Sequence, residues 1–275
     1  MKIIKKFLSI CGLAVFCLLI CGISAAETVG NTADIHLPMG KGIYSAQLGD
    51  FITLNAGFDA ELINERKFDS SDNVSTGQKL EGVYYMAKLS CTLFDRIQPY
   101  ITAGISDLEM TWLAGADGAV KIEAGTAGAW GGGLKAYLWK FEGMGLKIFS
   151  TASFRITKSD SPRTVIVAGD TNNITEDRFH IYEKQATLGI SKEFFIPGYE
   201  EASIVPYCGI AWSDTIARVK VVHNTNPINA GVDGNKDNIG LFLGADFIFV
   251  DNLSLNIEGR LIDQKSISAG FTALF

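Results

Sequence analysis

Hydrophobic and polar residues alternate with a period of two over most of the chain after residue 50. In 51–62 the even positions, such as Leu54 and Phe58, are apolar, whereas the odd positions include Asp59 and Glu61. A strand projects successive side chains to opposite faces, and a helix would scatter the same residues around its axis. The alternation therefore predicts β-strands with one apolar face and one polar face.

The alternation recurs in ten runs, each followed by a turn or a polar loop. The expected strands are 51–62, 79–94, 98–112, 121–139, 145–157, 179–194, 204–222, 238–249, 253–261 and 266–275. Most of them reach the roughly 9–11 residues that a tilted strand needs to cross a bilayer, whereas strands of soluble sandwiches average about 5–6 residues. The fourth and seventh runs could contain bulges, so eight or twelve strands are alternatives to ten.

The connections between the runs alternate in length. Those after the second, fourth, sixth and eighth runs are short, whereas 158–178 and 224–237 are long and polar. The turn at 263–265 is tight although it falls in the long set. An even strand number with long loops at one rim and short turns at the other is typical of outer-membrane barrels. We therefore expect an all-β fold: a closed antiparallel transmembrane β-barrel of ten strands with both termini on the periplasmic side.

The N-terminus has the organisation of a secretory signal peptide: a basic start, an apolar stretch at 7–23 and small residues ending at Ala26. We expect cleavage after Ala26, with Ala25 as the alternative. The expected domains are a signal peptide at 1–26, a short periplasmic segment at 27–48 and the barrel at 49–275.

Composition agrees with strands rather than with membrane helices. The 275 residues are 47% hydrophobic and 20% charged, and the mean hydropathy is +0.19. After the N-terminus no run approaches the roughly 18 apolar residues of a membrane-spanning helix. The net charge is −6 and becomes −9 without the three lysines of the expected signal peptide. Such acidity disfavours nucleic acid as a partner.

Two cysteines, Cys91 and Cys208, remain after removal of the expected signal peptide. In an exported protein they could form a disulfide. The expected strands separate them and direct both side chains towards lipid, so we expect two free thiols.

The polar faces of the expected strands carry eleven charged residues that would line the lumen. They are the acids Asp59, Glu61, Glu183, Glu193, Asp246 and Glu258 and the bases Lys88, Lys135, Lys147, Arg155 and Arg260. A barrel of ten strands is narrow enough for side chains to fill, and buried charges must be paired. Because acids and bases nearly balance, we expect a structural ion-pair network. The alternative is a narrow path for small solutes or ions.

A surface hydrolase is a third hypothesis, since proteases exist among ten-stranded barrels. Such an enzyme needs paired acids and a His–Asp unit at the outer rim to activate water. His180 lies near Asp177, and His223 follows Asp214, but neither histidine has the paired acidic motif. Acidic residues in the two long loops lack the spacing of a calcium loop. We expect no enzymatic activity, no cofactor and no metal site.

Short motifs at the strand ends add a family resemblance. Residues 99–105 read PYITAGI, residues 206–210 begin with the same Pro-Tyr pair, and the chain ends with AGFTALF at 269–275. With these motifs the chain resembles the small bacterial outer-membrane barrels of the OmpA/OmpW-like type. The resemblance implies that Tyr100 and Tyr207 lie in the interfacial aromatic girdle. It also implies that the barrel-assembly machinery recognises the last strand through Phe271 and Phe275.

Together these observations predict a porin-like cell-envelope protein in the outer membrane of a Gram-negative bacterium. We expect a non-catalytic role, either in structural integrity or in surface interaction through the extracellular loops. A narrow porin-like channel is the alternative. The expected partners are outer-membrane lipids, the barrel-assembly machinery and an extracellular ligand on loops 158–178 and 224–237.

Overall fold

All regular elements in the described part of the chain are β-strands. The computed structural model describes residues 52–68, 75–94, 96–114, 119–141, 144–159, 164–167, 174–223, 226–233, 238–249 and 253–274. Within these ranges no helix is long and apolar enough to cross a membrane. The expected signal peptide and periplasmic segment lie outside the described residues.

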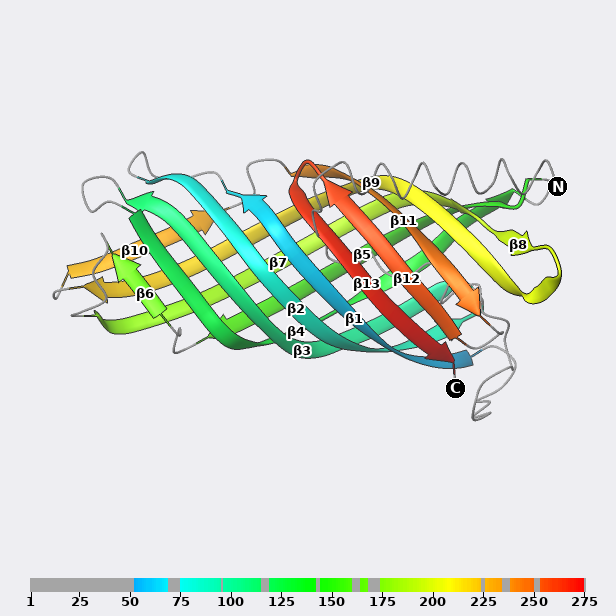
Figure 1. The fold of residues 1–275 in the computed structure, drawn as a ribbon, viewed down its shortest axis with the longest axis horizontal. Coiled ribbons are helices and arrows are strands. Elements are labelled where there is room, and N and C mark those ends of the chain that lie inside the picture. Colours follow the sequence, from blue (N-terminus) through cyan, green and yellow to red (C-terminus); the bar gives the residue numbers. More distant parts are fainter. Residues whose placement is uncertain are drawn as a thin grey trace.

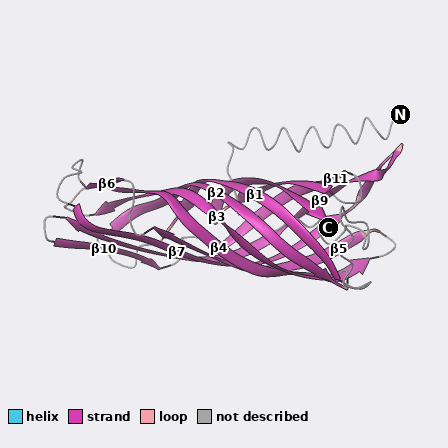
Figure 2. Cartoon of the chain, turned by 90° about the horizontal axis from the view of Figure 1, so that it is seen from below, coloured by secondary structure: helices cyan, strands magenta, loops and turns pink. Residues whose placement is uncertain are grey.

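Thirteen strands form one sheet. Their bounds are β1 Ile52–Lys67, β2 Ser75–Leu93, β3 Ile97–Ala114, β4 Ala119–Phe141, β5 Leu146–Ser159, β6 Thr164–Val167, β7 Ile174–Lys192, β8 Phe194–Ile196, β9 Tyr199–His223, β10 Asn226–Asp233, β11 Ile239–Phe249, β12 Leu253–Leu261 and β13 Gln264–Leu274. Ten of them close a barrel in the order β1-β2-β3-β4-β5-β7-β9-β11-β12-β13, because β1 pairs with both β2 and β13 (Figures 1 and 2). All pairings are antiparallel, so the prediction of a closed ten-stranded barrel is confirmed.

The two long connections are not simple loops, which corrects the sequence-based expectation. The stretch 158–178 contains β6 and the beginning of β7, and 224–237 contains β10. Thr164–Val167 is a run of four β-branched residues, which favour strands, and it pairs with the beginning of β4. β10 pairs with Ile216–His223 of β9. Both strands extend the barrel wall at the end opposite the C-terminus (Figure 1).

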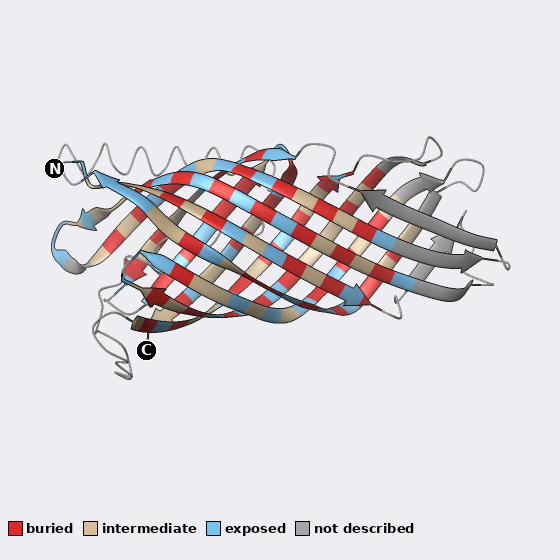
Figure 3. Cartoon of the chain, turned by 180° about the vertical axis from the view of Figure 1, so that it is seen from behind, coloured by how far each residue is buried: buried red, intermediate tan, exposed pale blue. Residues whose placement is uncertain are grey.

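The wall has an apolar outer face and a polar inner face through much of its height. On β1 the outward side chains Leu54 and Leu62 are 38% and 42% exposed, whereas the inward Asn55 and Glu61 are 2% and 4% exposed. Figure 3 shows this alternation of buried and exposed residues along the strands. An apolar exterior around a polar interior is the arrangement required in lipid. The protein is therefore an outer-membrane β-barrel.

The cysteines follow the same rule. Cys91 on β2 is half-buried, Cys208 on β9 is exposed, and both are free thiols, as expected.

Candidate functional site: the filled lumen

The inner face is apolar towards the end of the barrel that carries β6 and β10. On β2 the inward Leu80 is fully buried while the neighbouring Lys79 and Glu81 project outward. On β3 the inward Met110 is fully buried and the neighbouring Glu109 is outward. This is the polarity of a soluble protein, so this part of the wall lies beyond the bilayer. The opposite end of the barrel carries the short β2–β3, β4–β5 and β11–β12 turns, and short turns face the periplasm in outer-membrane barrels, so we name this part the extracellular extension.

Apolar side chains from six strands meet inside the extracellular extension and at its border with the apolar band. This apolar plug consists of Ile63, Phe68, Leu80, Tyr84, Met86, Leu108, Met110, Ile122, Ala124, Ala129, Phe179, Ile181 and Ala217. Burial of such side chains stabilises by about 1.5–3 kcal/mol for each large residue. The plug therefore closes the extracellular end of the lumen with a hydrophobic core.

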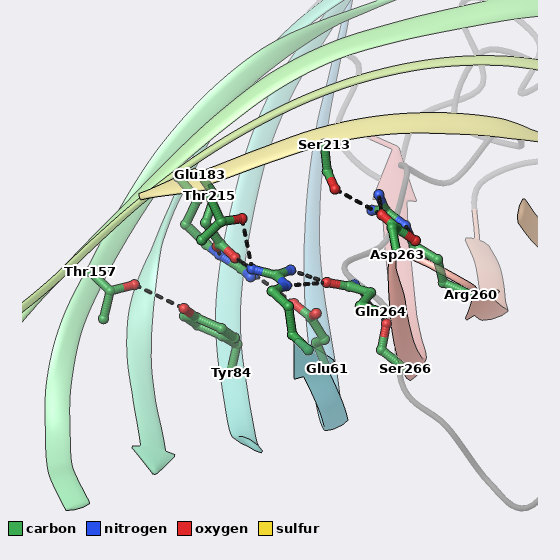
Figure 4. Close-up of polar contacts among 12 residues, drawn as sticks. Glu61, Tyr84, Thr157, Glu183, Ser213, Thr215, Arg260, Asp263, Gln264 and Ser266 are labelled. Carbon is green, nitrogen blue, oxygen red and sulfur yellow. Dashed lines mark hydrogen bonds and ion pairs between the residues drawn. The ribbon is translucent and has the colours of Figure 1, made fainter. Parts of the chain in front are cut away.

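An ion network lies next to the plug and spans the lumen (Figure 4). Arg155 on β5 donates to Glu61 on β1 at 2.6 Å and also to Glu183 on β7. Arg66 on β1 forms an ion pair with the same Glu183. Its guanidinium also donates to the Gln264 side chain, at 2.7 Å from Nε, and to Thr215 at 3.2 Å.

The network balances its charge in a buried position. Two arginines face two glutamates, and their side chains are between 2% and 4% exposed. A buried charge without a partner is strongly destabilising, whereas a paired and hydrogen-bonded one is tolerated. Each member of the network is therefore held by the others.

Tyr84 connects the ion network to the apolar plug. Its ring lies 3.4 Å from the guanidinium carbon of Arg155, a cation–π contact, and its hydroxyl lies 3.1 Å from the Thr157 hydroxyl. Tyr84 is itself completely buried and belongs to the plug. The two layers therefore form one continuous packing unit.

A second buried ion pair lies at the β12–β13 hairpin. Arg260 pairs with Asp263, and the Ser213 hydroxyl donates to the same carboxylate at 2.8 Å. Both side chains of the pair are 0% exposed. The hairpin thus folds its acidic residue inward and contributes to the filling of the lumen.

Three aromatic rings fill another part of the lumen. Phe149, Tyr207 and Phe242 have ring centroids 6.1–6.2 Å apart. Gly189 faces the rings, and a Cβ atom there would lie 2.5 Å from Cζ of Phe149. A glycine is required for this close approach.

The Tyr207 hydroxyl ties the aromatic group to polar residues of β11 and β12. It donates to Glu258 at 2.9 Å and accepts from Asn256 at 2.8 Å. Asn256 also donates to Asp246 at 2.7 Å. The hydroxyl is therefore satisfied although the residue is buried.

The positions of Tyr100 and Tyr207 correct the girdle assignment. Tyr207 is 4% exposed inside the barrel, and Tyr100 lines an internal cavity. Alternation explains both positions, because each tyrosine follows an outward proline, at Pro99 and Pro206, and so faces inward. The Pro-Tyr motif therefore supplies lumen-filling rings rather than interfacial ones.

A small cavity of about 40 Å³ remains beside Glu61 and Arg155 of the ion network, along the inner face of β1 to β5. Its polar lining includes Asp59, Lys88, Thr102 and Lys135, together with Tyr100. Lys88 and Lys135 are 5% and 1% exposed. The volume suffices for a few water molecules.

The eleven charged residues expected in the lumen fall into groups. The structure brings Glu61, Arg155 and Glu183 together in the ion network. Asp59, Lys88 and Lys135 lie at the cavity. Asp246 and Glu258 lie near the Tyr207 hydroxyl, and Arg260 pairs with Asp263. Lys147 and Glu193 lie apart from these groups and are only partly buried. The Lys147 ammonium is 5.2 Å from the Tyr137 ring, and Glu193 accepts from Ser203 at 2.9 Å.

Two charged lumen residues, Arg66 and Asp263, were not expected from the sequence. Strict alternation would direct Arg66 outward, but the register shifts between Ile63 and Glu65. The extra residue of this bulge, Asn64, reverses the alternation and turns Arg66 inward. Asp263 belonged to the expected hairpin turn, and a turn pattern does not indicate on which side its side chains lie.

The outer wall carries the aromatic residues exposed to lipid. Trp130, Trp139 and Trp212 are exposed, and the Phe58 and Phe271 rings lie 6.2 Å apart across β1 and β13. Phe271 faces outward, and Phe275 lies outside the described residues. The Trp112 side chain is also outside the described part.

Among the described side chains, the residues considered for a hydrolase site do not form a cluster. His180 projects from the outer face of β7, whereas the side chains of Asp177 and His223 lie outside the described residues. Among the residues that the structure covers, no group of three or more His, Cys, Asp or Glu could hold a metal ion.

No family model and no curated protein matches this chain. Among solved structures it is similar to the outer membrane protein OprG from Pseudomonas aeruginosa, with a TM-score of 0.44 and 10% identity, covering 82% of this chain and 96% of that chain. It is also similar to the translocator domain of the autotransporter NalP from Neisseria meningitidis, with a TM-score of 0.44, 10% identity and coverage of 84% and 90%. The outer membrane protease OmpT from Escherichia coli gives a TM-score of 0.40, 10% identity and coverage of 82% and 95%. The assignment as an outer-membrane barrel rests on the closed strand pairing and the apolar outer face.

Proposed function

We propose that this protein is a packed, non-conducting outer-membrane barrel whose role is surface interaction through its extracellular extension. The observation that carries the proposal is the filling of the lumen by the apolar plug and the ion network, which are joined at Tyr84. An ion crossing this region would have to displace paired arginines and then enter a hydrophobic core. Both steps are strongly unfavourable.

The length of the strands supports a role outside the membrane. β9 has 25 residues and β4 has 23 residues. A tilted strand crosses the bilayer in about 9–11 residues, so roughly half of each strand projects beyond it. A barrel with only a structural role within the bilayer would not need strands that project beyond it. The extension offers an outer surface built on β6 and β10 as well as on the barrel strands.

Conductance in planar bilayers tests the proposal. The wild-type protein is expected to show no stable open level, and Leu188→Ala, which changes an outward side chain away from the cavity, is expected to behave identically. A stable open level that shifts in Arg155→Gln or Lys147→Gln would favour the narrow porin-like channel instead. A peptidase activity abolished by His180→Ala would favour a hydrolase and contradict the non-catalytic role.

A further inference from the structure

Charged side chains encircle the outer wall where the apolar band ends. On the side formed by β13 and β1 to β4 the lysines have acidic partners, although Asp107 on β3 forms no ion pair with a described side chain: Lys265 contacts Glu65 at 2.6 Å, and Lys121 contacts Glu109 at 2.9 Å. We name this side the paired collar. It consists of Glu65, Lys67, Lys79, Glu81, Glu109, Lys121, Glu123 and Lys265.

The opposite side, on β5, β7 and β9, has a different charge balance. Three of its outward basic residues, here named the basic patch, are Lys158, Lys184 and Arg218. The described acid on this stretch of the outer face is Asp214, which is opposite Lys184. No ion pair joins Lys158, Lys184 or Arg218 to an acid whose side chain the structure describes. The patch therefore carries excess positive charge.

Strand register concentrates this charge. His180 is directly opposite Lys158 on one side and Arg218 on the other, so Lys158 and Arg218 belong to one row across three strands. Two strand spacings separate them, roughly 10 Å. An anion bound between their long side chains would interact with both.

The basic row lies next to an outward apolar row, which separates it from Lys184 and Asp214. The next outward row towards the C-terminal end of the barrel contains Ile156, Tyr182 and Ile216. The Arg218 guanidinium lies over the Tyr182 ring, 5.8 Å from its centroid. Long basic side chains at such a boundary reach the level of the lipid headgroups.

We propose that the basic patch binds a phosphate-bearing headgroup of the outer leaflet. Arginine recognises phosphate through paired hydrogen bonds, and lysine adds a compact point charge. The paired collar lacks this capacity because its own glutamates occupy its lysines. The protein would therefore hold phosphorylated lipid on one side of its circumference, next to β5, β7 and β9.

Native mass spectrometry of the full-length refolded protein can test the proposal, with bis-phosphorylated lipid A and its dephosphorylated form as probes. Each removed cation near a lipid surface is expected to weaken binding about fivefold. Lys158→Gln with Arg218→Gln should therefore reduce lipid A retention by roughly 25-fold. The matched control, Lys79→Gln with Lys121→Gln in the paired collar, should leave retention within about twofold of wild type, since these lysines already have acidic partners.

Equal losses in the two double variants would overturn the proposal, and so would equal wild-type retention of the dephosphorylated lipid. This second comparison needs no variant and stays decisive if a substituted protein does not fold. Complete displacement of lipid A by millimolar inorganic phosphate would also contradict a lipid site, because it would assign the patch to free anions.

Discussion

Arg155 has two acidic partners and one aromatic partner, which makes it the centre of the ion network. Arg155→Gln leaves Glu61 and Glu183 buried with a single cation, Arg66. We expect the free energy of unfolding to fall by about 3–5 kcal/mol, the usual effect of breaking a buried pair. Urea titration in vesicles, followed by tryptophan fluorescence, measures this change.

The same network provides the control. Glu61→Gln in the Arg155→Gln background removes the acid that lost its partner, so the double variant should recover at least about 1 kcal/mol of the loss. Strictly additive losses would indicate that Glu61 and Arg155 do not interact.

Glu65 in the paired collar titrates outside the membrane. The hydrogen bond from Lys265 lowers the pKa of its carboxyl below the ordinary value, and partial burial opposes this effect. A lowered pKa in the folded state contributes stability above the unfolded pKa, and the contribution is lost as pH falls through the folded pKa. Lys265→Gln should therefore raise the pKa of Glu65 and destabilise by less than about 1 kcal/mol at pH 7, and the difference should disappear once the pH falls below the folded-state pKa of Glu65. Carbon-13 titration of the carboxyl checks the pKa, and an unchanged value would contradict the ion pair.

At the scale of the elements, Gly189 on β7 packs against the Phe149 ring on β5 and the Phe242 ring on β11. Gly189→Ala adds a Cβ atom 2.5 Å from Cζ of Phe149 and 2.9 Å from Cζ of Phe242. Overpacking of this kind destabilises by about 1–3 kcal/mol. Urea unfolding of Gly189→Ala alone and combined with Phe149→Leu measures it, and the smaller side chain should restore part of the loss. If Gly189→Ala with Phe149→Leu is no more stable than Gly189→Ala alone, crowding by the rings is not the reason that this position needs glycine.

Period-two alternation predicted the barrel strands and their faces because one face meets lipid and the other the lumen. It could not predict the Asn64 bulge, which reverses the alternation and brings Arg66 into the lumen. Nor could it pair Glu61 with Arg155, since these residues lie 94 positions apart and their contact depends on the stagger of the closed barrel. The strand character of β6 was missed because four residues between polar stretches give too short a signal.

At the scale of the whole molecule, the outer face has two environments. Leu89 on β2 is outward and 59% exposed within the apolar band, whereas Thr126 on β4 is outward and exposed in the extracellular extension. An arginine facing lipid near the bilayer midplane costs about 2–4 kcal/mol, and an arginine facing water costs little. Leu89→Arg should therefore destabilise strongly in vesicles, while Thr126→Arg should lie within about 0.5 kcal/mol of wild type.

Repeating the stability measurements of both variants in detergent micelles distinguishes destabilisation caused by lipid contact from destabilisation caused by weaker strand pairing. Micelles deform around a charge more readily than a bilayer does, so the difference between the two variants should shrink there. Equal destabilisation by both variants in vesicles would mean that the wall crosses the membrane at a different level from the apolar band. In that case the apolar plug would lie inside the bilayer. The wall around it would not project from the membrane, which would contradict the proposal of surface interaction through the extracellular extension.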